Sequence, residues 1–165
     1  MTDRCYQLVF RLKRTETPAV PDTPGFRACF TVGHALPLLV PLFRRLGPGG
    51  LVKDLVKLAT RGRHYFCIVE NGRIVSDAYV VVGRCRHYDV EPDAAVIGPV
   101  WTADEARGRG LATRLLQQTM TALQGHGCST FYIDTSDRNM AMLKVIEKCG
   151  FGQPVQRIEK RGAIG

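Results

Sequence analysis

The run Arg107-Gly108-Arg109-Gly110 lies where a polar loop gives way to an amphipathic helix, and it restricts the fold more than any other feature of the chain. Glycine lets the backbone turn sharply and lets another group come close, because it carries no Cβ atom. The start of a helix also offers unpaired N–H groups and the positive end of the helix dipole. Together these features predict a binding site for an anion such as a phosphate.

The segments around this run predict a strand before it and a helix after it. Residues 94–102 have the composition of a strand, and Gly98 and Pro99 inside them indicate a bulge or a splay where pairing with a neighbour stops. Apolar residues at helical spacing then predict a helix that begins at Leu111. Unpaired strand groups can bind the amides of an extended ligand, and the helix start can bind its pyrophosphate. Coenzyme A has both parts.

The rest of the chain predicts one α/β domain over residues 1–165, without repeats or linkers. Asn71-Gly72 favours a tight hairpin between two β-rich runs, since both residues tolerate positive φ angles. Asp137 is the expected N-cap of the last helix. The other expected elements are strands at 5–12, 129–135 and 154–160 and helices near 51–62 and 138–150.

The formal net charge of +8, from 23 basic against 15 acidic residues, suits a polyanionic ligand such as a nucleotide or a phosphorylated cofactor. Nucleic acid is disfavoured as a partner, because the aromatic residues are not interleaved with the basic ones. The longest apolar run is too short to span a bilayer and the N-terminus has no signal-peptide pattern, so we expect a cytoplasmic protein with no membrane partner. The six cysteines form no cluster at metal-ligand spacing, so no metal is expected.

Two motifs resemble the GNAT N-acetyltransferase superfamily. Residues 107–112 match its signature (Arg/Gln)-x-x-Gly-x-(Gly/Ala), and residues 139–151 are similar to its last helix, which closes with Glu-Lys-x-Gly-Phe. The resemblance covers about residues 65–154. It implies a mixed, mostly antiparallel sheet flanked by helices, with a V where the strands at 94–102 and 129–135 part. It also implies acetyl-CoA or another short acyl-CoA as co-substrate.

By the same resemblance, backbone N–H groups at the start of the first motif's helix hold the pyrophosphate, and main-chain groups of the strand pair with the pantetheine arm. One strand N–H polarises the thioester carbonyl, and a primary amine attacks it directly without a covalent acyl-enzyme. The residues assigned to cofactor binding in this way are Val100, Trp101, Thr102, Arg107, Gly108, Arg109, Gly110, Leu111, Ala112, Thr113 and Asn139.

Proton transfer is where the chain departs from the family pattern. Many members carry a Tyr one position before the Glu of the last-helix motif, where it protonates the leaving thiolate, and this chain has Ile146 there. Asp134, late in its strand, is the first candidate for a general base that neutralises the attacking amine. A helix cap or an ion pair with Arg138 is the structural alternative for Asp134. His87 is a second polar candidate, as part of the wall of the substrate site.

The acceptor is expected to be a small-molecule amine. A few residues of both motifs are similar to a GNAT branch that acylates nucleotide-linked amino sugars, and a basic surface suits such a substrate. A protein N-terminus or lysine ranks below it. The competing hypotheses are a degenerate module that binds acyl-CoA without turnover, motivated by Ile146, and a nucleic-acid-binding protein. A monomer or a homodimer is expected.

Overall fold

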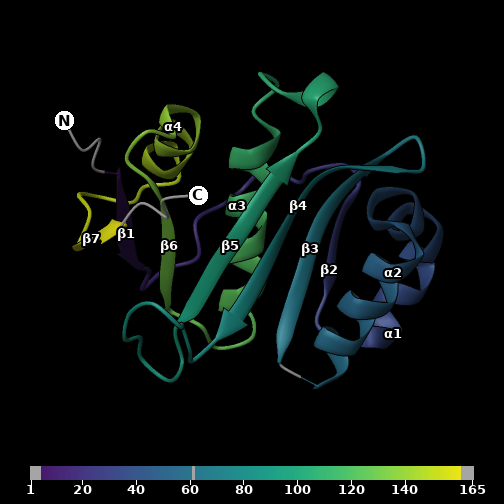
Figure 1. The fold of residues 1–165 in the computed structure, drawn as a ribbon, viewed down its shortest axis with the longest axis horizontal. Helices are drawn as coiled ribbons and strands as arrows, with labels where there is room; N and C mark the ends of the chain where they lie inside the picture. Colours follow the sequence, from purple (N-terminus) through teal and green to yellow (C-terminus); the bar gives the residue numbers. More distant parts are fainter. Residues whose placement is uncertain (1–4, 61, 161–165) are drawn as a thin grey trace.

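One mixed sheet forms the centre of the computed structural model, which describes residues 5–60 and 62–160. Its strands lie in the order β2-β3-β4-β5-β6-β1-β7 (Figure 1). The strands are β1 (Cys5–Lys13), β2 (Phe26–Cys29), β3 (Arg63–Glu70), β4 (Arg73–Val82), β5 (Ala95–Thr102), β6 (Thr130–Ser136) and β7 (Gln156–Lys160). The α-helices are α1 (Val32–Ala35), α2 (Leu39–Thr60), α3 (Leu111–Gln124) and α4 (Met140–Lys148), and short 3-10 turns span Leu36–Leu38 and Asp104–Ala106.

The sheet is antiparallel except between β5 and β6, which run parallel. Within the described chain these two strands pair only from Ala95 to Ile97 on β5, opposite Phe131 to Ile133 on β6. Beyond that point they part. The predicted fold, a mostly antiparallel mixed sheet with a splayed strand pair, is therefore confirmed.

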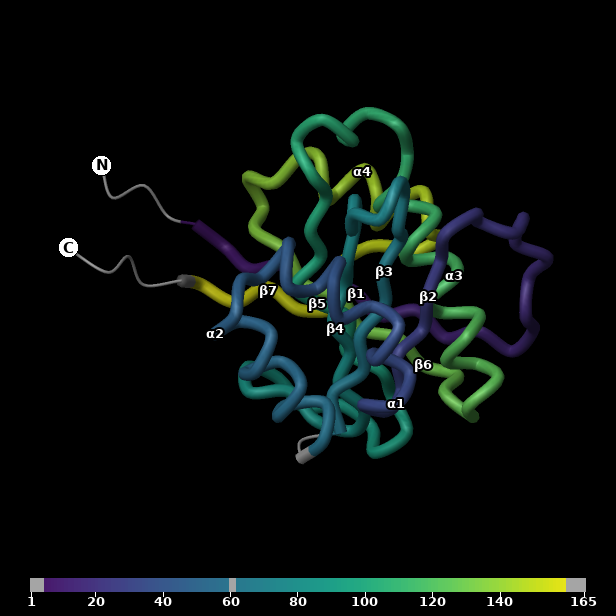
Figure 2. The backbone as a smooth tube through the Cα atoms, turned by 90° about the vertical axis from the view of Figure 1, so that its right-hand side faces the viewer, coloured from purple at the N-terminus to yellow at the C-terminus, as the bar shows by residue number. Residues whose placement is uncertain are grey.

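Helices cover both faces of the sheet (Figure 2). The helices α3 and α4 pack on one face, where the core includes Phe66, Leu115 and Ile146. The helices α1 and α2 pack on the other face, where Leu42 and Tyr65 belong to a second cluster. Burial of these apolar side chains on two faces holds the sheet rigid beneath the site. Among the helices of the described ranges, none is long and apolar enough to cross a membrane.

The first strand occupies an internal position in the sheet. The sequence predicts a strand at 5–12 but gives no place for it, and β1 lies between β6 and β7, antiparallel to both. Gln7 thereby stands opposite Ser136, and Val9 stands opposite Asp134. Val9 and the neighbouring Phe10 are buried. This placement carries residues from the start of the chain to the point where the cleft opens.

Local predictions hold at the turns but fail at one helix cap. Asn71 and Gly72 have φ angles of 49° and 68°, which confirms the hairpin. The predicted N-cap Asp137 is wrong: Asn139 caps α4, its side chain accepting from the Met142 N–H at 3.1 Å. The Asp137 carboxylate instead accepts from the backbone N–H of Tyr6 at 3.2 Å, because β1 lies alongside.

Two segments near the N-terminal end differ from the sequence-based expectation. The helix expected near 51–62 is the second half of α2, which is kinked at Gly47 with φ of 70°. The strand β2 has no sequence prediction, because it is only four residues long and follows a proline-rich loop. It pairs with β3 and forms the edge of the sheet.

Candidate functional site

The parting of β5 and β6 opens a cavity of about 720 Å³, called here the V cleft. Its walls are residues 96–100 of β5 and 133–136 of β6. A loop after β4, residues 84–87, closes one side, and Gln7, Val81, Asn139 and Met142 complete the lining. Because pairing with β6 ends at Ile97, the main chain of β5 beyond it can bond to a ligand instead of a strand. The cleft suits an extended ligand that carries amides.

The glycine run leads from the open end of β5 into α3. Gly108 and Gly110 have φ angles of 76° and 73°, a region that strongly favours glycine. Apart from each glycine's own neighbours in the chain, no atom of the described residues lies within 4 Å of the place a Cβ would take at either position, so the space before the helix is open. Within the described chain no side chain caps the start of α3, which leaves its first N–H groups free for an anion.

The arginines of the run hold the loop through their side chains. Arg107 is 2.8 Å from Asp104, and Arg109 donates two hydrogen bonds to the Glu70 carboxylate, at 2.8 and 2.9 Å. Arg114 donates to the backbone carbonyl of Arg109 at 2.6 Å. These contacts tie the loop to the end of β3 and to α3. The arginine side chains of the run are therefore engaged with the protein itself, while the backbone N–H groups at the start of α3 stay open.

The strand residues assigned to cofactor binding through their main chain differ in where their side chains lie, and the assignment itself stays a prediction. Val100 and Asn139 line the V cleft. Trp101 and Thr102 are outside the residues that line it: the Thr102 hydroxyl shares a hydrogen bond with Ser76 on β4 at 3.0 Å, and the Trp101 ring lies under the guanidinium of Arg45. Leu111 is buried beneath the helix start, and Ala112 and Thr113 are half-buried in its first turn.

The candidate base Asp134 lies in the V cleft with both carboxylate oxygens engaged. Tyr88 donates to one oxygen at 2.9 Å, and the amide nitrogen of Gln7 donates to the other. Burial and the neighbouring carboxylate raise the pKa of Tyr88, so its phenol stays protonated as a donor. Asn139 caps α4, so the helix-cap alternative for Asp134 is wrong. His87 is exposed at the rim of the cleft that it helps to line, so its role in a substrate wall stays a prediction beside that of a surface histidine.

Sequence reasoning missed several residues of the cleft. Gln7 of the first strand lines the cleft, and Tyr88 of the loop before β5 lies outside its lining but holds Asp134; neither is near Asp134 in the chain. Arg84 and Arg86 also line the cleft and give it positive charge. The basic run at 84–87 is the one signal that could have found them. Ile146, in contrast, is 1% exposed and packs in the core under α4.

The comparisons with known proteins agree on one family. The model of the Acetyltransferase (GNAT) family matches residues 38–151, more than half of the 165 residues. A search of curated proteins finds no significant match. A proposed acetyltransferase from Agrobacterium tumefaciens is 26% identical, with a TM-score of 0.59 over 83% of this chain and 99% of its own.

Two further solved structures have the same fold. A proposed GNAT-family acetyltransferase from Novosphingobium aromaticivorans is 22% identical, with a TM-score of 0.64 over 95% of this chain and 63% of its own. The aminoglycoside N-acetyltransferase AAC(6')-Iy is 20% identical, with a TM-score of 0.62 over 83% of this chain and 97% of its own, in complex with the bisubstrate analogue CoA-S-monomethyl-acetylneamine. This chain thus spans less than two thirds of the protein from Novosphingobium aromaticivorans and nearly all of AAC(6')-Iy.

Proposed function

Because the chain belongs to the GNAT family of acetyltransferases, we propose that it moves an acetyl or short acyl group from acyl-CoA to the primary amine of a small molecule. The observation that carries this proposal is the V cleft, where β5 and β6 part and β5 leads straight into the glycine run before α3. An extended arm and a pyrophosphate, the two ends of the co-substrate, have matching places there.

The co-substrate is held mainly by backbone groups. N–H groups from Arg109 to Thr113 bind the pyrophosphate at the start of α3, where the helix dipole favours negative charge. The free edge of β5 near Val100 pairs with the pantetheine amides, and one N–H there polarises the thioester carbonyl. Asn139, at the rim of the cleft, contacts the arm through the amide nitrogen that its capping bond leaves unused.

The reaction requires a neutral amine at the thioester carbonyl. The nitrogen forms a bond to the carbonyl carbon, the carbon–sulfur bond breaks, and the amine proton passes to a base. Asp134 is that base, held in place by its hydrogen bonds from Tyr88 and Gln7. Since Ile146 is buried in the core, the thiolate leaves without a proton donor from that position. His87 in the cleft wall is the alternative base.

An amino sugar, in particular a nucleotide-linked one, is the acceptor we favour. Two features support it. The neighbour AAC(6')-Iy is an aminoglycoside N-acetyltransferase, and Arg84 and Arg86 give this chain's cleft a positive wall that suits an anionic substrate.

The test measures binding first and transfer second. Calorimetric titration with acetyl-CoA, longer acyl-CoAs and free CoA should give micromolar affinity and identify the acyl group that fits. Release of CoA thiol is then followed with a panel of amines that includes amino sugars and their nucleotide-linked forms. Turnover of any small amine supports the proposal. Tight CoA binding without transfer to any amine contradicts it and favours the non-catalytic binding module.

A further inference from the structure

A second cavity, of about 620 Å³, lies beside the end of β5 on the face of the sheet that carries α2. It is lined by three arginines from two elements, Arg44 and Arg45 of α2 and Arg73 at the start of β4, and we call it the arginine cavity. Trp101, Asp104 and Glu105 form other parts of its wall. Trp101 directly follows Val100, which lines the V cleft, so consecutive residues of β5 line the two cavities.

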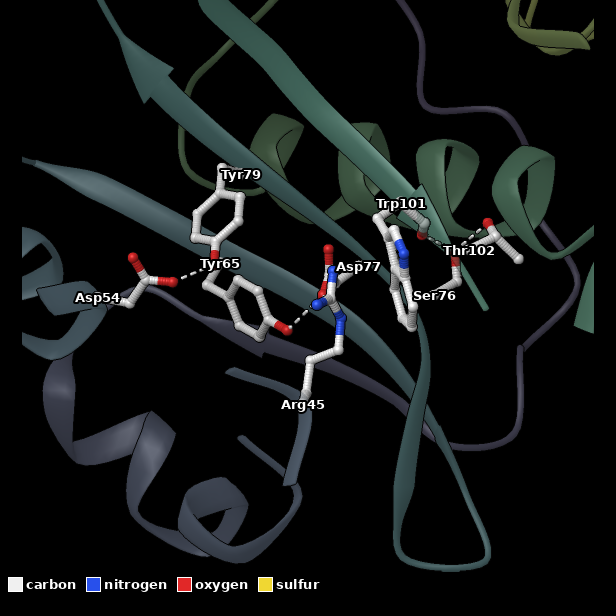
Figure 3. Close-up of polar contacts among 8 residues, drawn as sticks. All are labelled: Arg45, Asp54, Tyr65, Ser76, Asp77, Tyr79, Trp101 and Thr102. Carbon is white, nitrogen blue, oxygen red and sulfur yellow. Dashed lines mark hydrogen bonds and ion pairs between the residues drawn. The ribbon is translucent and has the colours of Figure 1, made fainter. Parts of the chain in front are cut away.

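Arg45 is held in a defined position in this cavity. Its Nε atom lies 3.3 Å from the carboxylate of Asp77, and its guanidinium carbon lies 3.5 Å from the centre of the Trp101 ring (Figure 3). Asp77 is 2% exposed and also accepts a hydrogen bond from the Tyr65 hydroxyl at 3.1 Å. The positive charge is thus fixed in place before any ligand arrives, so little ordering entropy is lost on binding.

The donors of the arginine cavity are largely unused. The Nε atom of Arg45 lies within ion-pair distance of Asp77 but forms no hydrogen bond, and the two terminal amino groups of Arg45 form none with residues 5–60 and 62–160. Arg44 and Arg73 are exposed and likewise form no ion pair with the described residues. Of the two acidic residues in the wall, Asp104 is already paired with Arg107 at 2.8 Å. The cavity therefore has more positive than negative charge.

We propose that the arginine cavity binds an oxyanion carried by the acceptor, so that the substrate is an amine that also bears a carboxylate or a phosphate. This inference rests on the proposed acyl transfer in the V cleft. Trp101, in the wall of the arginine cavity, directly follows Val100, near which the proposed thioester site lies.

The single tryptophan of the sequence provides a binding assay that needs no turnover, because Trp101 is in the cavity wall. The fluorescence of the full chain is titrated with inorganic phosphate and, separately, with acetate. A saturable change is expected with at least one of them, and the tighter of the two identifies the oxyanion. The double variant Arg44→Gln/Arg73→Gln should weaken the affinity for the anion about tenfold or more, since loss of a hydrogen bond to a charged group has this effect.

Two matched variants control for the change of charge. Arg27→Gln removes an exposed arginine of β2 that lines neither cavity, and it should leave the affinity unchanged. Glu105→Gln removes an acid from the cavity wall and should leave the affinity equal or tighter. An equal loss in Arg27→Gln, or no saturable signal with either anion, overturns the inference. Repeating the titration at saturating CoA should leave the affinity for the anion unchanged. Competition between CoA and the anion would mean that the arginines bind CoA phosphates, and it would overturn the inference as well.

The transfer assay compares acceptors in pairs that differ only in the oxyanion, such as an amino acid and its amide or an amino sugar with and without a phosphate. The ratio of kcat/KM between the anionic and the neutral member should fall about tenfold in each of Arg44→Gln and Arg73→Gln. An unchanged ratio overturns the inference while the proposed function stands. Anion binding that depends on the arginines, without transfer to any amine, overturns the proposed function instead.

Discussion

Consecutive residues of β5, Val100 and Trp101, line the V cleft and the arginine cavity, yet one region relies on backbone groups and the other on side chains. The cleft is formed where strand pairing stops, and its proposed anion site is the unpaired backbone at the start of α3 beside Gly108 and Gly110. The arginine cavity is formed by charged side chains that three separate elements bring together. A site made of backbone depends on local residue types such as glycine, whereas a site made of side chains depends on how distant elements pack. Substitutions should therefore affect the two regions differently.

The largest effect is expected at the backbone site. Gly110→Val should weaken acyl-CoA binding about a thousandfold, because three N–H bonds to phosphate at about 1.5 kcal/mol each are disturbed. The valine side chain would take the open space in front of α3, and the backbone φ of 73° at position 110 is strained for a β-branched residue. Calorimetry with acetyl-CoA measures the affinity. Gly152→Val is the control, because Gly152 has open space but no positive φ; equal losses would contradict the assignment.

Substitutions beside the arginine cavity should lower the free energy of unfolding. Asp77→Ala removes the partner of Arg45 and leaves the Tyr65 hydroxyl without an acceptor, so the free energy of unfolding should fall by about 3 kcal/mol. Urea denaturation measures the change. The double variant Asp77→Ala/Arg45→Met should recover part of the loss, since the unpaired charge is gone. A double variant less stable than Asp77→Ala would mean that Arg45 is held by contacts other than this ion pair.

Catalysis in the V cleft should depend on Asp134 more than on its neighbour. Asp134→Asn should lower kcat about a hundredfold, the usual size of a general-base contribution, with little effect on acyl-CoA affinity. Steady-state kinetics over pH compare it with His87→Gln, which changes the other polar group of the wall. If His87→Gln lowers kcat and Asp134→Asn does not, the base is His87.

The smallest effect is expected at the position where the family pattern has Tyr. Ile146→Val should reduce the free energy of unfolding by about 1 kcal/mol, as the loss of one buried methyl group does. Its kcat should stay within about twofold of the wild type, because the side chain packs in the core. Ile68→Val, at a position equally buried in β3, is the matched control. A tenfold fall in kcat for Ile146→Val alone would mean that this side chain shapes the reacting site.

Much of the V cleft could be predicted from the sequence, because its signals are local. Asn71-Gly72 makes the hairpin by its positive φ angles, and Gly98-Pro99 coincides with the end of pairing to β6. Gly110 predicts the turn into α3. Each of these depends on the conformations that one or two residues allow, which the sequence states directly. Spacing along a strand does not say which cavity a side chain enters, so the sequence could not place the Trp101 side chain in the wall of the arginine cavity.

Long-range packing alone decided the rest. β1 lies between β6 and β7, which brings Gln7 to Asp134 across more than a hundred residues. Packing of α2 on β3 and β4 brings Arg45 to Asp77 and Trp101. Such pairs depend on strand order and register, and these follow from which apolar faces can be buried together in one fold. The sequence by itself therefore determined the family, the cleft and its glycine run, and the tertiary structure decided which charged side chains surround them.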